Sequence, residues 1–375
     1  MRNFIRNFKG NFKRNFISNF MRNFKTYFIV FVPNLMIVLA LMIVLAGCGE
    51  DSENVIRVFN WGDFLDESIL TDFTEQTGIR VLYQTFASNE EMYARVTGGA
   101  GDGFDLLFPS DYMIERMIRE DLLLPINFDN IPNIRYIDER FFNLDFDPES
   151  RYSVPYKWGT LGILYNTTMV GDLVVDSWDV LWDPQFAGNI FMYDSVRDSF
   201  AVALNKLGYS INTTNPAELA AARDLLMEQS PLVRAFLGDE IKNAMVGREG
   251  ALAVVFSGDA MFTMYLNPEL NYVVPREGSN VWFDAMVIPR GARNQAGAEA
   301  FINFLNQPEI ALRNTMYTWY STTNRAAFDM LPEEMRNNPV YWPPDEIYQA
   351  GEVFVHLGEF TEDFNRAWNE VLTAR

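Results

Sequence analysis

Acidic and aromatic side chains are combined within and just after apolar segments of this chain. Asp259 follows the apolar stretch 251–256, and Asp284 lies inside the apolar stretch 280–288 together with Trp282. A carboxylate inside an apolar strand is hard to explain as part of a solvated face, because burying an unpaired charge is unfavourable. Carboxylates and tryptophan faces both attract ammonium groups. The combination is typical of a site that binds an amine.

The residue types used by many enzymes are scarce in this chain. His356 is the only histidine and Cys48 the only cysteine. Nucleophilic systems of the Ser-His-Asp or Cys-His type and histidine-rich metal sites are therefore excluded. Asp and Glu are abundant, so chemistry with a pair of carboxylates stays open. We expect a protein without catalytic residues, cofactor or metal.

The only cysteine ends the run Leu-Ala-Gly-Cys at 45–48, which resembles a bacterial lipobox. In such signals the peptide is cleaved before the cysteine, whose sulfur carries a diacylglyceryl group. Residues 1–47 contain seven basic and no acidic residues and become apolar from about 27 to 46, as in a signal peptide. We expect a lipoprotein signal at 1–47, lipidation of Cys48 and a polar tether at 48–53.

Two alternatives remain for this segment. The apolar stretch approaches the ~20 residues that span a bilayer, so it could act as an uncleaved anchor. Cys48 could instead be a buried structural thiol. With either membrane signal, the folded part lies outside the cytoplasm. The motif Arg-Asn-Phe recurs four times before residue 25, which indicates either a repeat expansion or a start at Met21.

Charge and length limit the partners and the architecture. Beyond residue 47 there are 23 Lys and Arg against 50 Asp and Glu, a formal charge of −27. Such a chain repels nucleic acid and anionic lipid and favours a cationic ligand. The remaining length exceeds one ordinary hydrophobic core, so two lobes are expected.

Strand-like and helix-like segments alternate along the chain. Strands are predicted at 55–59, 79–86, 104–108, 162–165, 189–193, 251–256 and 280–288, and the clearest helices at 66–77, 196–207 and 296–306. Asp66 and Ser88 are expected to cap helices at their N-termini, and Gly78 to end one. The alternation favours an α/β fold with a largely parallel sheet.

Several motifs, in order from residue 55 to the C-terminus, resemble the spermidine/putrescine-binding proteins of polyamine ABC transporters. The segments that carry the resemblance are 59–64 (FNWGDF), 88–90 (SNE), 105–110 (DLLFPS), 152–159 (YSVPYKWG), 203–210 (ALNKLGYS), 275–278 (PREG), 282–284 (WFD) and 302–305 (INFL). The resemblance implies a two-lobed periplasmic-binding-protein (type II) fold with a hinged ligand cleft. It assigns 54–159 plus 283–328 to lobe 1 and 160–282 plus 329–375 to lobe 2. It also implies a monomeric binding subunit that delivers putrescine and/or spermidine to ABC permease subunits.

The resemblance also implies ligand-binding residues, most of them at strand ends, where open α/β sheets usually place ligands. Carried over position by position, these are Trp61, Asp63, Phe64, Ser110, Tyr112, Asp198, Phe256, Asp259, Trp282, Asp284 and Tyr320. Structural roles compete at some of them. Asp198 could cap a helix, and Asp63 could be a turn residue. Trp61 and Trp282 could belong to the core, as we expect for Trp178.

Several positions depart from the family pattern and leave the preferred polyamine open. These are Gly62 in place of a hydroxyl residue, Ser195 in place of the aspartate of spermidine-type members, Phe256 in place of tryptophan and Phe354 in place of glutamine. Asp259 matches an aspartate of putrescine-type members. One alternative is the same fold binding another cationic solute, such as an amino acid or peptide. Another is a surface enzyme that uses an Asp/Glu pair.

Overall fold

The computed structural model describes residues 54–98 and 103–374, which belong to one contact unit, Glu53–Arg375. The expected signal at 1–47, Cys48 and the tether at 48–53 lie outside the described residues. No helix of the described part is both long and apolar enough to cross a membrane.

Ten strands form the sheet of the described part. Their bounds are β1 (Val55–Trp61), β2 (Arg80–Phe86), β3 (Leu106–Leu107), β4 (Ser153–Asn166), β5 (Ile190–Tyr193), β6 (Val233–Leu237), β7 (Leu252–Phe256), β8 (Leu270–Val273), β9 (Val281–Val287) and β10 (Ser321–Thr322). The order is β2-β1-β3-β9-β4-β7-β5-β6, and β8 and β10 each pair with β4. All seven residues of β9 are buried, as expected for a strand with both faces covered.

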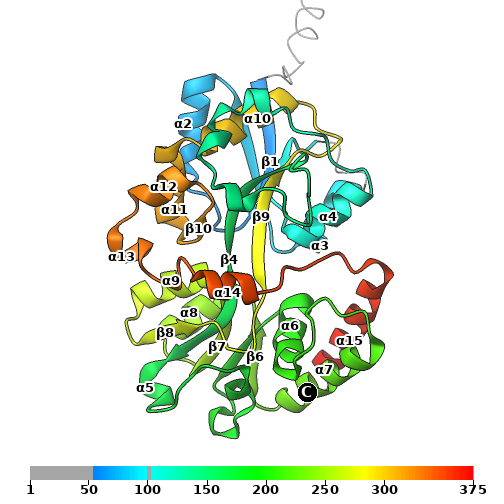
Figure 1. Ribbon diagram of the computed structural model, residues 1–375, viewed down its shortest axis with the longest axis vertical. Coiled ribbons are helices and arrows are strands. Elements are labelled where there is room, and N and C mark those ends of the chain that lie inside the picture. The colour runs from blue at the N-terminus through cyan, green and yellow to red at the C-terminus, as the bar shows by residue number, and fades with distance from the viewer. Residues whose placement is uncertain (1–53, 99–102, 375) are drawn as a thin grey trace, which may run out of the picture. The chain divides into compact units, whose positions relative to one another are not determined.

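The prediction of a largely parallel sheet is wrong. β1 pairs in parallel with β2 and β3, and β5 pairs in parallel with β6 and β7. These two parallel groups are joined through β4 and β9, which are antiparallel to each other and to their outer neighbours. Figure 1 shows β4 and β9 running side by side from the part that holds β1 to the part that holds β7. Strand direction depends on these long-range pairings, which the local pattern does not contain.

Helices cover the sheet. Their bounds are α2 (Ser68–Thr77), α3 (Asn89–Thr97), α4 (Asp111–Arg119), α5 (Thr167–Val170), α6 (Val196–Leu207), α7 (Pro216–Gln229), α8 (Glu240–Val246), α9 (Ser257–Leu266), α10 (Gln295–Leu305), α11 (Pro308–Thr318), α12 (Arg325–Met330), α13 (Glu333–Arg336), α14 (Asp345–Ala350) and α15 (Thr361–Thr373). Ser88 caps α3 as predicted, with its side chain accepting from the Glu91 N–H at 3.1 Å. Gly78 ends α2 with a left-handed φ of 75°. The N-cap of α2 is Glu67 and not Asp66.

The hydrophobic core divides part-way along β4. Trp158 belongs to a cluster that contains Phe59 of β1, Phe283 of β9 and Phe301 of α10. Leu161, three residues further along β4, belongs to a cluster built mainly with β5, α6, α7 and α15. A third cluster packs β7, α8 and α9 against residues 328–341. A single strand, β4, therefore passes from one core to another, while the core residues of β9 all belong to the first cluster.

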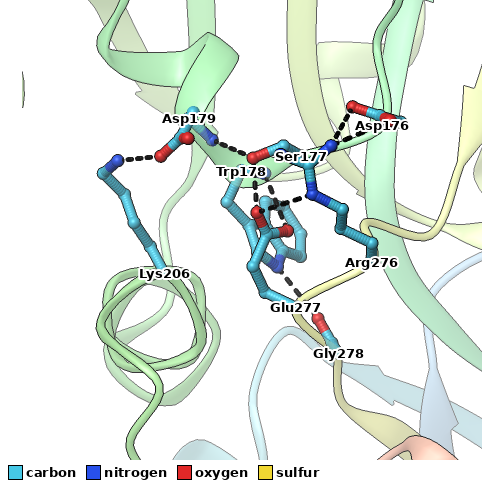
Figure 2. A network of polar contacts seen from close by, with 8 residues as sticks. All are labelled: Asp176, Ser177, Trp178, Asp179, Lys206, Arg276, Glu277 and Gly278. Atoms are coloured by element: carbon cyan, nitrogen blue, oxygen red, sulfur yellow. Dashed lines mark hydrogen bonds and ion pairs between the residues drawn. The ribbon is translucent and has the colours of Figure 1, made fainter.

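A polar network fixes the segment that leads into β9. Figure 2 shows its members, Asp176, Ser177, Trp178, Asp179, Lys206, Arg276, Glu277 and Gly278. The Glu277 carboxylate accepts from the Ser177 hydroxyl and, at 3.3 Å, from the Trp178 backbone N–H. The Trp178 indole N–H donates to the Gly278 carbonyl at 2.9 Å, and its side chain is fully buried. The prediction that Trp178 is a core residue is confirmed.

Candidate functional site

Asp284 lies on β9 with an incompletely satisfied carboxylate. The residue is only 5% exposed, and its Oδ1 has no hydrogen-bond partner among the described residues. Ser110, the residue before α4, forms a backbone bridge to Asp284. Burial raises the pKa of Asp284 to about 7, although the Ser110 hydroxyl acts in the opposite direction. Such a carboxylate gains most from a cation that enters beside it.

The indole of Trp282, two residues earlier on β9, is unsatisfied in the same way. It is 7% exposed, and its Nε1 has no hydrogen-bond partner in the described part of the chain. Its ring meets those of Phe256 and Tyr320 edge to face, with centroids 5.8 and 5.6 Å away. Tyr320 in turn packs against Phe64 at 4.9 Å. Four predicted ligand-binding aromatics thus form one connected cluster.

Asp259 lies in the first turn of α9 and is already paired. Its Oδ1 is 3.5 Å from the Lys242 ammonium of α8. Burial raises the pKa of Asp259, while Lys242 and a hydrogen bond with Tyr320 lower it. Asp63, after β1, is 3.7 Å from the same ammonium and is largely exposed. Its φ of 53° is a left-handed conformation that aspartate tolerates better than most residues.

Asp198 is a buried carboxylate in the first turn of α6. The Asp198 N–H donates to the Ser195 hydroxyl oxygen at 3.4 Å, and that hydroxyl donates to Asp198 Oδ2 at 2.6 Å. Ser195 is thus the N-cap of α6, and the Asp198 carboxylate accepts from the hydroxyl of that cap. Burial raises the pKa of Asp198 to about 6, against the effects of Ser195 and the neighbouring Arg197. The alternative that Asp198 caps the helix is therefore wrong, because Ser195 is the N-cap of α6.

Trp61 and Tyr112 are held by protein partners. The Trp61 indole N–H donates to the Phe108 carbonyl at 2.7 Å. The Tyr112 hydroxyl accepts from Asn89 at 3.1 Å and donates to Glu90 at 3.0 Å. Their rings also have protein neighbours: that of Trp61 packs on Phe86 at 4.5 Å, and that of Tyr112 lies 5.6 Å from the Arg197 guanidinium.

Three charged residues near these side chains were missed by the sequence analysis. Asp111 is fully buried, and its carboxylate accepts from the backbone N–H of Phe283 at 3.1 Å, which ties α4 to β9. Arg197 is buried with its guanidinium 4.3 Å from the ring centroid of Phe354. Lys242 was also missed. The position of Asp111 at a helix start, beside the predicted Ser110, was a usable signal, whereas nothing in the local sequence marks Arg197 or Lys242.

The contacts connect most of the predicted residues. Phe64, Tyr320, Trp282 and Phe256 are linked by their rings, and Tyr320 is hydrogen-bonded to Asp259. Ser110 joins them through Asp284. Their role in ligand binding stays a prediction. Among the described residues, no group of three or more His, Cys, Asp or Glu side chains is arranged to hold a metal ion.

Comparisons with known proteins define the class of protein. Residues 68–341 match the family model of the bacterial extracellular solute-binding proteins. The spermidine/putrescine-binding periplasmic protein of Escherichia coli is 34% identical over 336 residues, which cover 90% of this chain and 97% of that protein. These matches span both groups of parallel strands and the two strands that join them.

Solved structures agree with these matches. A Listeria monocytogenes protein assigned to a spermidine/putrescine ABC transporter is 44% identical, with a TM-score of 0.83, and the match covers 86% of this chain and all of that one. A lipoprotein of Treponema pallidum is 28% identical, with a TM-score of 0.76, over 84% of this chain and 99% of that one. The fold is therefore the two-lobed type II fold of solute-binding proteins.

This chain belongs to the bacterial extracellular solute-binding proteins. The resemblance to their spermidine/putrescine-binding members is confirmed. The family is one of solute-binding transport proteins and not of enzymes.

Proposed function

We propose that this protein is an extracytoplasmic solute-binding protein that captures a polyamine, putrescine and/or spermidine. The observation that carries the proposal is the pair of unpartnered buried polar groups on β9, Asp284 Oδ1 and Trp282 Nε1. Buried polar atoms are nearly always hydrogen-bonded in folded proteins, so the exceptions require an explanation. A ligand ammonium that binds beside Asp284 would provide one, and relatives that carry the names of polyamine-binding proteins support it.

The proposed site suits a flexible chain with charged ends and an apolar middle. An ammonium about 4 Å from the Asp284 carboxylate gains roughly 4 kcal/mol at an effective dielectric constant near 20. A tryptophan face adds about 0.5–2 kcal/mol by cation–π attraction. The rings of Trp282, Phe256, Tyr320 and Phe64 offer flat walls for methylene groups and exclude water. The carboxylates recognise the ends, and the rings hold the middle.

Transport and membrane attachment form the second part of the proposal. The protein hands its ligand to the permease subunits of an ABC transporter and is held at the membrane by a lipid on Cys48. A tether raises the effective concentration of a binding protein at its transporter. The lipobox-like run at 45–48 and the lipoprotein among the solved relatives support this attachment.

The two lobes are proposed to comprise 54–159 plus 283–328 and 160–282 plus 329–375. The change of core between Trp158 and Leu161 supports the first boundary. Closure of the lobes around a ligand would bend β4 and β9 near this point.

A second candidate ligand is an amino acid or peptide that carries both an ammonium and a carboxylate. The observation that favours it is Arg197, a buried cation whose Nε has no hydrogen-bond partner in the described part. Arg197 lies over the ring of Phe354, where polyamine-binding relatives were expected to have a glutamine. A ligand carboxylate could bind such a guanidinium.

Isothermal titration calorimetry distinguishes these ligands. The protein from residue 49 to 375 is titrated with putrescine, spermidine, lysine and Fe(III). We expect micromolar or tighter binding of at least one polyamine and no heat with Fe(III). Tighter binding of lysine than of either polyamine would favour the amino-acid alternative. Absence of heat with every amine would contradict the proposal, as would turnover of a glycan by the purified protein.

Lipid attachment is tested separately in cells. The full-length chain is expressed in a bacterium that is fed an alkyne-labelled palmitate. We expect label on the wild-type protein and none on Cys48→Ser, with the wild type in the membrane fraction. A labelled Cys48→Ser variant would contradict lipidation at Cys48, and an unlabelled wild type that retains residues 1–47 would support the uncleaved anchor instead.

A further inference from the structure

One end of the proposed site already contains an ammonium group. The Nζ of Lys242 is 3.5 Å from Asp259 Oδ1, 3.7 Å from Asp63 Oδ2 and 3.9 Å from Asp239 Oδ1. Asp63 and Asp259 are two of the four carboxylates that the family resemblance assigns to ligand ammonium groups. Asp63 follows β1, Asp259 begins α9 and Lys242 lies on α8, so the ammonium joins elements from two different cores.

The position of Lys242 is that of a partly desolvated cation. Its side chain is 16% exposed. Burial alone would lower the pKa of the Lys242 ammonium, but Asp259, Asp239 and Asp63 outweigh burial and raise it. The side chain is therefore charged at any pH at which the protein works. The side chain has four methylene groups and one terminal ammonium, so it resembles putrescine with one ammonium group removed.

At the opposite end, Lys157 of β4 is the cross-strand partner of Asp284, but its ammonium donates to the Thr315 hydroxyl at 3.3 Å and forms no ion pair with Asp284 among the described residues. Burial opposes the ionisation of Asp284 and raises its pKa, while the Ser110 hydroxyl acts in the opposite direction, and the buried carboxyl group of Asp111 also lies close enough to interact with it. An incoming ammonium therefore meets an unpaired carboxylate at Asp284 and an occupied carboxylate pair at Asp259 and Asp63.

We propose that Lys242 is a specificity-determining residue that supplies a built-in ammonium at the Asp63–Asp259 end of the site. This inference rests on the proposed polyamine-binding function. Because Lys242 already supplies one positive charge, a ligand with only one or two ammonium groups is enough to neutralise the carboxylates of the site. A ligand with a further ammonium that reaches Asp259 must displace Lys242 or bind beside it, and like charges at this distance repel. The preferred chemical class is therefore the short diamine over the longer triamine.

The test compares the gain in affinity across ligands of increasing charge. Calorimetry with butylamine, putrescine and spermidine is carried out on the wild type, Lys242→Met and Lys242→Arg. Methionine keeps the length of the stem and removes the charge, whereas arginine keeps the charge. We expect Lys242→Met to raise the ratio of spermidine affinity to butylamine affinity about tenfold. The change in putrescine affinity should lie between the changes for these two ligands. Lys242→Arg should leave the ratio within about twofold of the wild type.

Lys206→Met is the matched control. Lys206 forms an ion pair with Asp179 (Figure 2), and among the described residues it forms none with the carboxylates of the proposed site, although it lies on the same helix as Asp198. Its substitution changes the net charge by the same amount, so it measures the general effect of charge on cation binding. A ratio that shifts equally in Lys206→Met and Lys242→Met would overturn the proposal, and so would an unchanged ratio in Lys242→Met.

Failure of this inference can be told from failure of the proposed function. Wild-type binding of polyamines without a shift in Lys242→Met overturns only the role of Lys242. Binding of spermidine by Lys242→Met alone supports the role, because the built-in ammonium then blocks the wild-type site. No binding of any amine by either protein overturns both.

Discussion

The two ends of the proposed site differ in whether their carboxylates have partners. At the β9 end, Asp284 and Trp282 are buried with polar atoms that no described residue satisfies. At the α9 end, Asp259 and Asp63 share the ammonium of Lys242. Burying an unpaired carboxylate destabilises the ligand-free protein, and a ligand cation removes that penalty. The comparison indicates that the β9 end supplies affinity and the α9 end supplies selectivity.

The largest expected effect is on polyamine affinity, when one carboxylate is neutralised at each end in separate variants. Asp284→Asn should weaken polyamine binding about 100-fold or more, because the ligand ammonium loses its buried partner. Asp63→Asn should weaken it less than about threefold, because Asp63 is exposed and already paired. Calorimetry on both variants measures the difference. Similar losses in the two variants would remove the distinction between the ends.

The next largest expected effect is a pH dependence of polyamine affinity, which arises from Asp284 at the β9 end. The pKa of Asp284 is about 7, so at pH 6 only about one molecule in ten has this carboxylate ionised. Binding of an ammonium requires the ionised form, and polyamine affinity should fall about tenfold from pH 8 to pH 6. Asp198, with a pKa of about 6, would add a smaller part at the acidic end.

The pH series is measured by calorimetry at constant ionic strength. In Asp259→Asn the tenfold fall should persist, because the titrating group is at the other end. A wild-type affinity that is flat between pH 6 and pH 8 would contradict the assignment of Asp284 as the partner of the ligand ammonium.

Local patterns predicted the elements that position the site but not how they pair. The apolar run before Asp259 is β7, the run around Asp284 is β9, and Ser88 and Gly78 end helices as expected. These features depend on residues that are close in sequence. The antiparallel connection through β4 and β9 depends on segments more than 100 residues apart, and strand periodicity does not reveal direction.

The same limit applies to the candidate site. Sequence resemblance proposed both Asp259 and Asp284 as ligand carboxylates without separating their roles. Only the structure shows that Lys242 forms an ion pair with Asp259, whereas Lys157, the cross-strand partner of Asp284, directs its ammonium to Thr315 instead. A lysine on an exposed-looking helix carries no local signal of this kind, because two of its three carboxylate partners, Asp63 and Asp259, come from other parts of the fold.

The ligand-free stability should change in opposite directions at the two ends. Because the folded-state pKa of Asp284 is raised from 3.8 to about 7, the folded protein holds more protons than the unfolded chain in this window. The free energy of unfolding therefore falls as the pH rises from the unfolded pKa to the folded pKa. At pH 8 the full cost of burying the ionised Asp284 is present. Asp284→Asn removes the charge but buries an amide, so we expect a net gain of about 1 kcal/mol at pH 8.

Burial raises the pKa of Asp259 too, so removing its charge relieves part of the cost of burial. Lys242 nevertheless loses its nearest partner and keeps only two others, so we expect Asp259→Asn to give a net loss of up to about 1 kcal/mol in the free energy of unfolding. Thermal unfolding at pH 8 without ligand should show shifts of about 2 °C, upward for Asp284→Asn and downward for Asp259→Asn. At pH 4 the gain in unfolding free energy of Asp284→Asn should vanish, because Asp284 is then protonated in the folded wild type. Two shifts of the same sign at pH 8 would show that the ends do not differ in the way proposed.

The smallest expected effect concerns the ring that lies between the ends. Phe256 ends β7, immediately before α9, and meets both Trp282, at 5.8 Å, and Tyr193, at 5.0 Å. Phe256→Trp would restore the residue that is usual in polyamine-binding relatives and enlarge the aromatic wall without changing either carboxylate. An added indole face is worth about 0.5–1 kcal/mol to a bound cation, which corresponds to a gain of about two- to fivefold in affinity. Because the wall serves the methylene chain, putrescine and spermidine should gain alike in the same calorimetric titration. A gain confined to spermidine would instead place Phe256 with Lys242 among the residues that set selectivity.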